Sequence, residues 1–226
     1  MSANITRKLA GKAALVTGGS RGIGAAIAKR LAADGAAVAV TYSASPAKAD
    51  EVVRSIKAAG GKALAIKADA ADTEAVPLAV AKTIGTFGGI DILVNNAGVG
   101  IFAPIEQFSL EDFDKLIAIN VRGLFVATQE AARHMREGGR IIHIGSTNSE
   151  RMPFVGGSVY ALTKAAVAGF TRGVARDLGP RGITVNNVQP VRLIPTRIPP
   201  TATSPGRLFP SPPFSVMVMQ TRLPAS

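Results

Sequence analysis

The chain has 226 residues, enough for one sizeable α/β domain or two small ones, and its 47% hydrophobic content is typical of a globular protein. It contains no cysteine, which excludes disulfides and thiolate metal sites, and no stretch approaches the roughly 20 apolar residues of a membrane helix. The net charge of +11 comes from scattered lysines and arginines, so we expect a solvated basic surface and no nucleic-acid interface. No secretory signal follows Met1, and we expect a cytoplasmic location.

Short runs rich in β-branched residues alternate along the chain with alanine-rich stretches of helical periodicity. Glycines stand where helices should end, and Ser109 is placed to cap the start of one. Strict alternation predicts a parallel sheet covered on both faces, with ligands beyond the carboxyl ends of its strands. The predicted strands are 13–17, 37–41, 63–67, 90–95, 140–145 and 183–188, and the predicted helices are about 22–34, 46–59, 72–86, 109–136 and 158–179.

A glycine-rich turn joins the first predicted strand to the first predicted helix. Gly18 lets the backbone turn sharply, Gly22 lets a pyrophosphate approach the helix N-terminus, and Gly24 permits close packing against the strand. The spacing G-x3-G-x-G differs from the standard G-x-G-x-x-G, and such a turn alone could be an ordinary tight loop. Its strand–turn–helix context favours a dinucleotide site.

The end of the second strand bears on which nicotinamide dinucleotide is bound. An acid there would accept from a free ribose 2′-hydroxyl, but this chain has none between Tyr42 and Ser45. Arg21 in the turn, with Ser43 and Ser45, suits a 2′-phosphate, so NADP(H) is favoured over NAD(H). Asp69, after the third strand, could accept from the adenine amino group or could cap the next helix.

Three further residues predict carbonyl chemistry. Tyr160 and Lys164 are four apart on a predicted helix and so share a face, and Ser146 lies at the carboxyl end of a strand. A phenol needs a lowered pKa to exchange protons near neutrality, and the Lys164 ammonium would lower it. Ser146 can hydrogen-bond a carbonyl oxygen and hold it toward Tyr160.

These motifs together resemble the short-chain dehydrogenase/reductase family over residues of about 8–190. The resemblance implies a single-domain Rossmann-type α/β fold with a doubly wound parallel sheet and an Asn–Ser–Tyr–Lys set. Asn120 would then kink a long helix and hold a water that relays protons to Lys164, while Asn95, Ala97 and Gly98 would line the adenosine side. The matching motifs are T-G-x3-G-x-G at 17–24, N-N-A-G at 95–98, Asn120, Ser146 and Y-x3-K at 160–164. The remaining expected cofactor contacts are Ser20, Ile23, Tyr42, Ala44, Ala70, Asn96, Tyr160, Lys164 and Pro190.

The segments 145–148 and 151–153 resemble a subgroup whose members are variously named acyl-carrier-protein reductases, sugar dehydrogenases and cyclic-di-GMP-binding dispersal proteins, which settles no substrate. His134 and His143 have no partner pattern of a metal site, so we expect no metal and place His134 late on a helix and His143 in a strand.

After Pro190 the chain departs from the family pattern. Residues 191–226 hold eight of the 14 prolines, four arginines and no acid, a composition that predicts irregular structure. The segment is either a natural proline-rich tail or the product of a reading-frame shift near codon 191. We favour the frame shift, because the break falls inside a motif and takes the place of an expected final strand. The domain is therefore expected to cover 1–190.

The sequence thus predicts an NADP-dependent oxidoreductase that acts on a small-molecule ketone or secondary alcohol. One alternative is a non-catalytic dinucleotide-binding protein, for example a cyclic-di-GMP-binding relative, and another is a truncated inactive product. The resemblance also implies a homodimer through helices 109–136 and 158–179. We do not expect a tetramer, because the family's other interface is built on the last strand.

Overall fold

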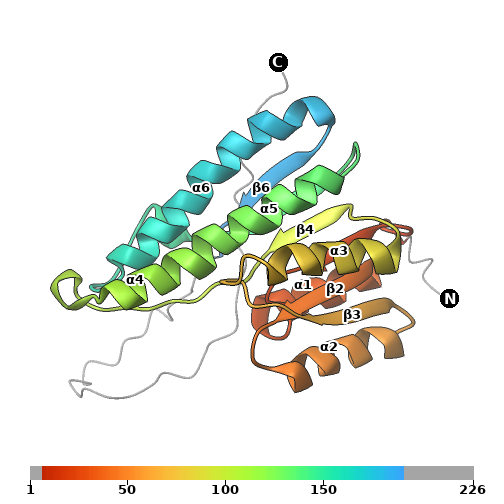
Figure 1. The fold of residues 1–226 in the computed structure, drawn as a ribbon, viewed down its shortest axis with the longest axis horizontal. Coiled ribbons are helices and arrows are strands. Elements are labelled where there is room, and N and C mark those ends of the chain that lie inside the picture. Colours follow the sequence, from red (N-terminus) through yellow and green to blue (C-terminus); the bar gives the residue numbers. More distant parts are fainter. Residues whose placement is uncertain (1–6, 191–226) are drawn as a thin grey trace.

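Six parallel strands form one sheet in the order β3-β2-β1-β4-β5-β6 (Figure 1). The computed structural model describes residues 7–190. Each strand is four to six residues long, and all but the edge strand β6 are rich in valine, isoleucine, leucine and alanine, as strands covered on both faces require. The strands are β1 (Ala13–Val16), β2 (Ala37–Tyr42), β3 (Lys62–Lys67), β4 (Ile92–Asn95), β5 (Arg140–Ile144) and β6 (Thr184–Val188).

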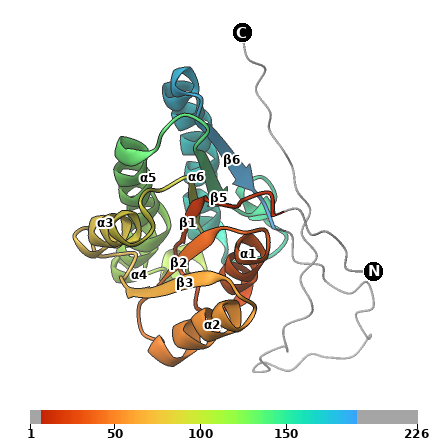
Figure 2. The same cartoon turned by 90° about the vertical axis from the view of Figure 1, so that its right-hand side faces the viewer.

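Helices connect successive strands and cover the sheet on both faces. Figure 2 shows α1 on one side of the sheet and α3 and α5 on the other. Two clusters of buried residues follow this division: one packs the sheet against α1 and α2, and the other packs it against α3, α5 and α6. The helices are α1 (Gly22–Ala33), α2 (Pro46–Ala58), α3 (Ala75–Phe87), α4 (Leu110–Ile117), α5 (Gly123–His134) and α6 (Ser158–Leu178).

The sheet reverses its strand order between β1 and β4. From β1 the chain proceeds outward to β2 and β3, then returns beside β1 and proceeds the other way through β4, β5 and β6. This confirms the predicted doubly wound Rossmann-type sheet. It also places the loops after β1 and β4 side by side, at the switch point where such sheets bind ligands.

Two predicted helices differ from the structure. The third begins at Ala75 instead of 72, because the Asp72 carboxylate accepts from the backbone N–H groups of Glu74 and Ala75 at 2.8 and 2.9 Å. The predicted helix 109–136 is divided into α4 and α5 by a π-helical turn at Ala118–Arg122. Its start is as predicted, since Ser109 Oγ accepts from the Asp112 N–H.

Both histidines lie in the predicted elements. His143 in β5 is fully buried, with Nδ1 2.9 Å from Thr171 Oγ1 and Nε2 3.3 Å from Thr128 Oγ1. His134 is the last residue of α5, where Nε2 lies 3.1 Å from a Glu130 carboxylate oxygen, a partner that the sequence analysis did not identify. Within residues 7–190, no group of three or more histidine, aspartate or glutamate side chains could hold a metal ion.

None of the helices described for residues 7–190 is long and apolar enough to cross a membrane. The irregular tail expected for 191–226, and with it the replaced final strand, lies outside the described residues.

Candidate active site

The glycine turn after β1 leads directly into α1. Gly18 and Gly22 adopt φ values of +62° and +56°, the left-handed region that favours glycine. Within the described residues, no side chain caps the N-terminus of α1 and no acid lies in its first turn. A Cβ at Gly22 would meet no atom of residues 7–190 within 4 Å. The helix therefore presents backbone N–H groups and positive dipole to open space, as an anion site requires.

Gly18 and Gly24 lie against neighbouring backbone. A Cβ on Gly24 would be 2.6 Å from the Gly18 carbonyl oxygen, and one on Gly18 would be 2.9 Å from Ala97 Cα. Gly24 thus lets the helix approach the turn itself, a more specific contact than the predicted packing on the strand. The turn and the segment after β4 are packed as one unit.

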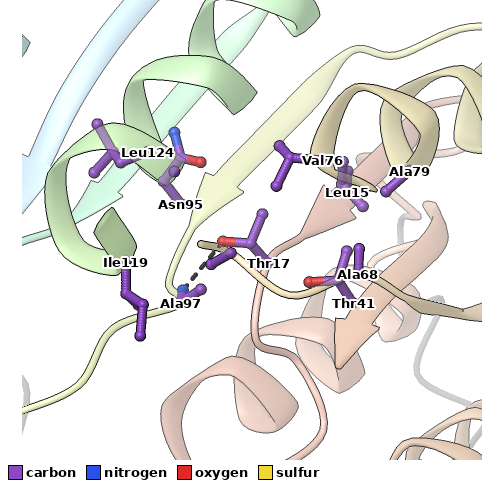
Figure 3. Close-up of a pocket in the computed structure, with 12 residues that line it drawn as sticks. Leu15, Thr17, Thr41, Ala68, Val76, Ala79, Asn95, Ala97, Ile119 and Leu124 are labelled. Atoms are coloured by element: carbon purple, nitrogen blue, oxygen red, sulfur yellow. Dashed lines mark hydrogen bonds between the residues drawn. The ribbon is translucent and has the colours of Figure 1, made fainter. Parts of the chain in front are cut away.

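Two threonines that the sequence analysis missed hold this unit together. Thr17 Oγ1 accepts from the N–H groups of Asn96 and Ala97 at 3.0 and 3.1 Å, and Thr41 Oγ1 accepts from the Gly18 N–H at 3.0 Å. Asn96 Nδ2 donates in return to the carbonyl oxygens of Thr17 and Gly18, both at 3.0 Å. Figure 3 shows Thr17 and Ala97 facing each other beside a pocket that Asn95 also lines. In the sequence, only the position of Thr17 in the T-G motif and of Thr41 in the second predicted strand could have indicated this role.

The side chains expected to hold a 2′-phosphate lie at the start of α1 and after β2. Tyr42 ends that strand, and 43–45 join it to α2, whose first turn contains no acid in the described structure. Arg21 is the N-cap residue of α1 and its side chain is exposed. This end of the site therefore offers a cation and hydroxyls but no carboxylate on β2.

Asp69 and Ala70 follow β3. Asp69 Oδ1 accepts from the Ala71 N–H at 2.9 Å, which closes a short turn. Because Asp72 caps α3, the alternative that Asp69 caps this helix is wrong. Ala70 lines the same pocket as Thr17 and Ala97.

The residues predicted for proton chemistry come from β5 and α6. Ser146 follows β5, and its Oγ accepts from the Asn148 N–H at 3.1 Å. Tyr160 and Lys164 are one helical turn apart on α6, and Lys164 Nζ lies 5.8 Å from the centroid of the Tyr160 ring. Lys164 Nζ also donates to the Ile144 carbonyl at 2.9 Å, which ties the helix to the end of the strand.

Burial governs the protonation of these groups. It raises the pKa of Tyr160, and a hydrogen bond with Ser146 partly counteracts the rise. Burial also lowers the pKa of Lys164 to about 8. In the structure, the Ser146 hydrogen bond is the interaction that lowers the Tyr160 pKa, and the expected effect of Lys164 stays a prediction.

Asn120 lies in the π-helical turn and is almost completely buried. Its Oδ1 accepts from the Val99 N–H at 2.9 Å, and its Nδ2 donates to the Val99 carbonyl at 2.9 Å and to Thr163 Oγ1 at 3.2 Å. Thr163 Oγ1 donates in turn to the Tyr160 carbonyl at 2.8 Å. Both amide hydrogens of Asn120 are thus used in anchoring, and the side chain can hold a relay water only through Oδ1.

Gly98 brings the two halves of the site together. A Cβ there would lie 3.4 Å from Asn120 Oδ1 and 3.6 Å from Lys164 Nζ. Pro190, after β6, accepts from the Thr147 N–H at 3.4 Å beside Ser146. The predicted site residues therefore all gather at the carboxyl ends of the strands. Sequence reasoning missed Thr163 and Val99. It also missed the exposed aromatic residues Phe102 and Phe154, which lie in loops without periodicity.

Comparisons with known proteins agree with this geometry. The family model for short chain dehydrogenases matches residues 12–199. The cyclic-di-GMP-binding biofilm dispersal mediator protein of Escherichia coli strain K12 is 48% identical over 80% of this chain and 72% of its own length. The short-chain dehydrogenase/reductase from Serratia marcescens BCRC 10948 is 62% identical, with a TM-score of 0.80 over 80% of this chain and 74% of that one. A short chain dehydrogenase from Burkholderia cenocepacia J2315 in complex with NADP is 57% identical, with a TM-score of 0.79 and the same coverage.

Proposed function

Because the chain belongs to the short-chain dehydrogenase family, we propose that it is an NADP-dependent oxidoreductase that interconverts a small ketone and the corresponding secondary alcohol. The observation that carries the proposal is the position of Ser146, Tyr160 and Lys164 at the same end of the sheet as the glycine turn. A nucleotide held on the turn would extend along the strand ends toward these three side chains.

The residues around the turn fit NADP(H). The pyrophosphate would lie over Gly22 at the start of α1, where a Cβ would meet nothing within 4 Å among residues 7–190. Arg21, Ser43 and Ser45 supply a cation and two hydroxyls for the 2′-phosphate. The adenosine would contact 69–70 and 96–98, with Ser20, Ile23 and Pro190 completing the site. Support also comes from the NADP complex of the Burkholderia cenocepacia relative.

When bound, the nicotinamide would supply or accept the hydride at the carbonyl carbon. Tyr160 gives its phenolic proton to the carbonyl oxygen during reduction and takes it back during oxidation. Ser146 donates a hydrogen bond to the same oxygen and holds it toward Tyr160. Lys164, whose pKa is about 8, stays largely protonated at neutral pH and favours the phenolate that Tyr160 becomes. Asn120 positions the α4–α5 turn beside Lys164.

The test is NADPH oxidation by the full-length chain with a panel of ketones, followed at the nicotinamide absorbance. Tyr160→Phe removes only the hydroxyl, so it should lower kcat by about a hundredfold or more while NADPH binding and thermal stability stay near those of the parent. Turnover unchanged by this substitution would contradict the assignment of Tyr160.

A non-catalytic role is the second candidate, because one relative is named as a cyclic-di-GMP-binding protein. Calorimetric titration of the chain with NADPH, NADH and cyclic di-GMP separates the two. Tight cyclic di-GMP binding without ketone-dependent NADPH oxidation would support the second candidate. NADPH binding with turnover would reject it, together with the expectation of an inactive product.

We further propose that the chain forms a dimer through α4, α5 and α6. Leu110 and Leu162 are large apolar side chains that are largely exposed on these helices. Size-exclusion chromatography with light scattering would report the mass in solution. The cytoplasmic location stays a prediction, as does the domain boundary at 190.

A further inference from the structure

Two phenylalanines are exposed directly beside the candidate acid–base residue. Phe102 is 51% exposed and Phe154 is 45% exposed. The Phe102 ring centroid lies 5.4 Å from that of Tyr160 and 5.5 Å from that of Phe154, which it meets edge to face. We call Phe102 and Phe154 the aromatic wall. Single exposed apolar side chains are common on protein surfaces. A pair of them beside a reactive phenol is instead typical of a ligand-binding surface.

Two loops from different parts of the fold hold this wall. The Ala103 N–H donates to the Gly156 carbonyl at 3.1 Å, so the loop after β4 is joined to the loop before α6. Gly156 has a φ of +84°, which permits this approach. A Cβ on Gly100 would lie 2.9 Å from the Phe102 ring, so the ring folds back over Gly100 toward Tyr160. The wall is therefore built into the site.

The composition around the wall selects the kind of ligand. Segments 99–105 and 152–157 contain no charged residue, and Ile105 and Val155 are exposed at 68% and 89%. A phosphate or carboxylate would find no cation on these segments, whereas an uncharged ring would bury apolar surface on both. Aromatic rings also gain from edge-to-face and offset contacts beyond the area that they bury.

We propose that the aromatic wall binds the ring of an aryl ketone, or of the corresponding aryl alcohol, while Ser146 and Tyr160 hold its oxygen. The proposal rests on the proposed function and specifies its substrate class. Phe102 is the main specificity-determining residue, because its ring contacts Tyr160, and Phe154 supports it from the opposite loop. In the reduction, NADPH would give its hydride to the carbonyl carbon that bears the ring and leave as NADP⁺, and the oxygen would receive the Tyr160 proton; the oxidation of the alcohol is the reverse.

The experiment compares acetophenone with cyclohexyl methyl ketone, which share one carbon skeleton and differ in the aromaticity of the ring. We expect kcat/KM of the full-length chain with NADPH to be about tenfold higher for acetophenone. Phe102→Leu should bring the ratio of the two values close to one, and Phe154→Leu should lower it about threefold. Phe125→Leu is the matched control, because Phe125 on α5 is 44% exposed and pairs with Phe170 at 5.9 Å, away from the site.

Equal kcat/KM for both ketones in the parent, or a ratio that Phe102→Leu leaves unchanged, would overturn the proposal. If neither ketone is reduced, the proposed function fails with these substrates, and ligand-observed NMR titration of the NADPH-loaded chain then decides the inference by itself. Preferential acetophenone binding that Phe102→Leu weakens and Phe125→Leu preserves would support the wall. Equal binding of the two ketones would refute it.

Discussion

Asn120 binds both backbone groups of Val99, accepting from its N–H and donating to its carbonyl, each at 2.9 Å. The pair joins the π-helical turn between α4 and α5 to the segment that follows β4. The third bond of Asn120 is to Thr163, which itself bonds the Tyr160 carbonyl. The asparagine therefore positions the backbone on which Tyr160 and Lys164 stand.

Substitution of Asn120 should reduce stability as well as activity. Asn120→Leu removes the partner of both part-buried backbone groups of Val99 and the bond to Thr163, and we expect a loss of about 3 kcal/mol in the free energy of unfolding, measured by urea denaturation. Thr163→Val removes one bond of the same network and should cost about 1 kcal/mol. An Asn120→Leu variant as stable as the parent would show that the anchoring has no energetic role.

We expect Lys164 to lower the free energy of unfolding at neutral pH. Burial lowers its pKa from 10.5 to about 8, so the folded chain binds the proton less well than the unfolded chain does, and below pH 8 the full penalty applies. After the lost bond to Ile144 is subtracted, Lys164→Met should stabilise the fold by about 2 kcal/mol at pH 7 and abolish turnover.

This gain should shrink as the pH rises from about 8 to 10.5, because the folded lysine is then neutral and the free energy that the unfolded lysine gains by binding a proton falls toward zero. Lys67→Met, at an exposed lysine that ends β3, is the control and should change stability little. Thermal denaturation at pH 7 and pH 10 checks both points, and a Lys164→Met variant less stable at pH 7 would contradict the argument.

Acid should weaken the fold partly through His143. Burial lowers its pKa from 6.5 to about 4, so the unfolded chain takes up this proton first and stability falls as pH decreases through that interval. His143→Asn should remove about 3 kcal/mol of the difference in unfolding free energy between pH 7 and pH 4. Urea titrations of the parent and of His143→Asn at several pH values provide the measurement.

Arg21 should select the cofactor. Its exposed guanidinium at the start of α1 is the proposed partner of the 2′-phosphate, so Arg21→Ala should raise the Kd for NADPH at least about tenfold and leave NADH binding almost unaffected. Arg30→Ala, on the same helix but paired with Asp34, is the control. Fluorescence titration of the parent and both variants with each nucleotide gives the six dissociation constants needed, and an equal loss for NADPH and NADH would place the 2′-phosphate elsewhere.

The sheet and the glycine turn were predictable because both depend on local patterns. Strand positions 13–16 and 37–42 are contiguous apolar runs, and Gly18 and Gly22 mark backbone that other residues adopt with strain. The start of α3 was placed too early because Asp69 and Asp72 are equally good turn residues, and only the bonds that each makes distinguish them.

Features that depend on distant partners were not predictable in this way. Thr17 acts through Asn96 and Ala97, which lie 79 and 80 positions away along the chain. The π-helical turn has no periodicity of its own, although the family resemblance implied a kink at Asn120. The aromatic wall joins two loops through the bond between Ala103 and Gly156, and neither loop shows an apolar pattern that indicates its partner.

The segment 96–99 is hydrogen-bonded to Thr17 at one end and to Asn120 at the other. It therefore connects the glycine turn proposed to hold the nucleotide to the residues proposed for proton transfer. Ser43 and Ser45 lie beyond β2, outside this segment. We therefore expect substitutions at 43–45 to change the proposed cofactor preference without altering the residues proposed for carbonyl chemistry.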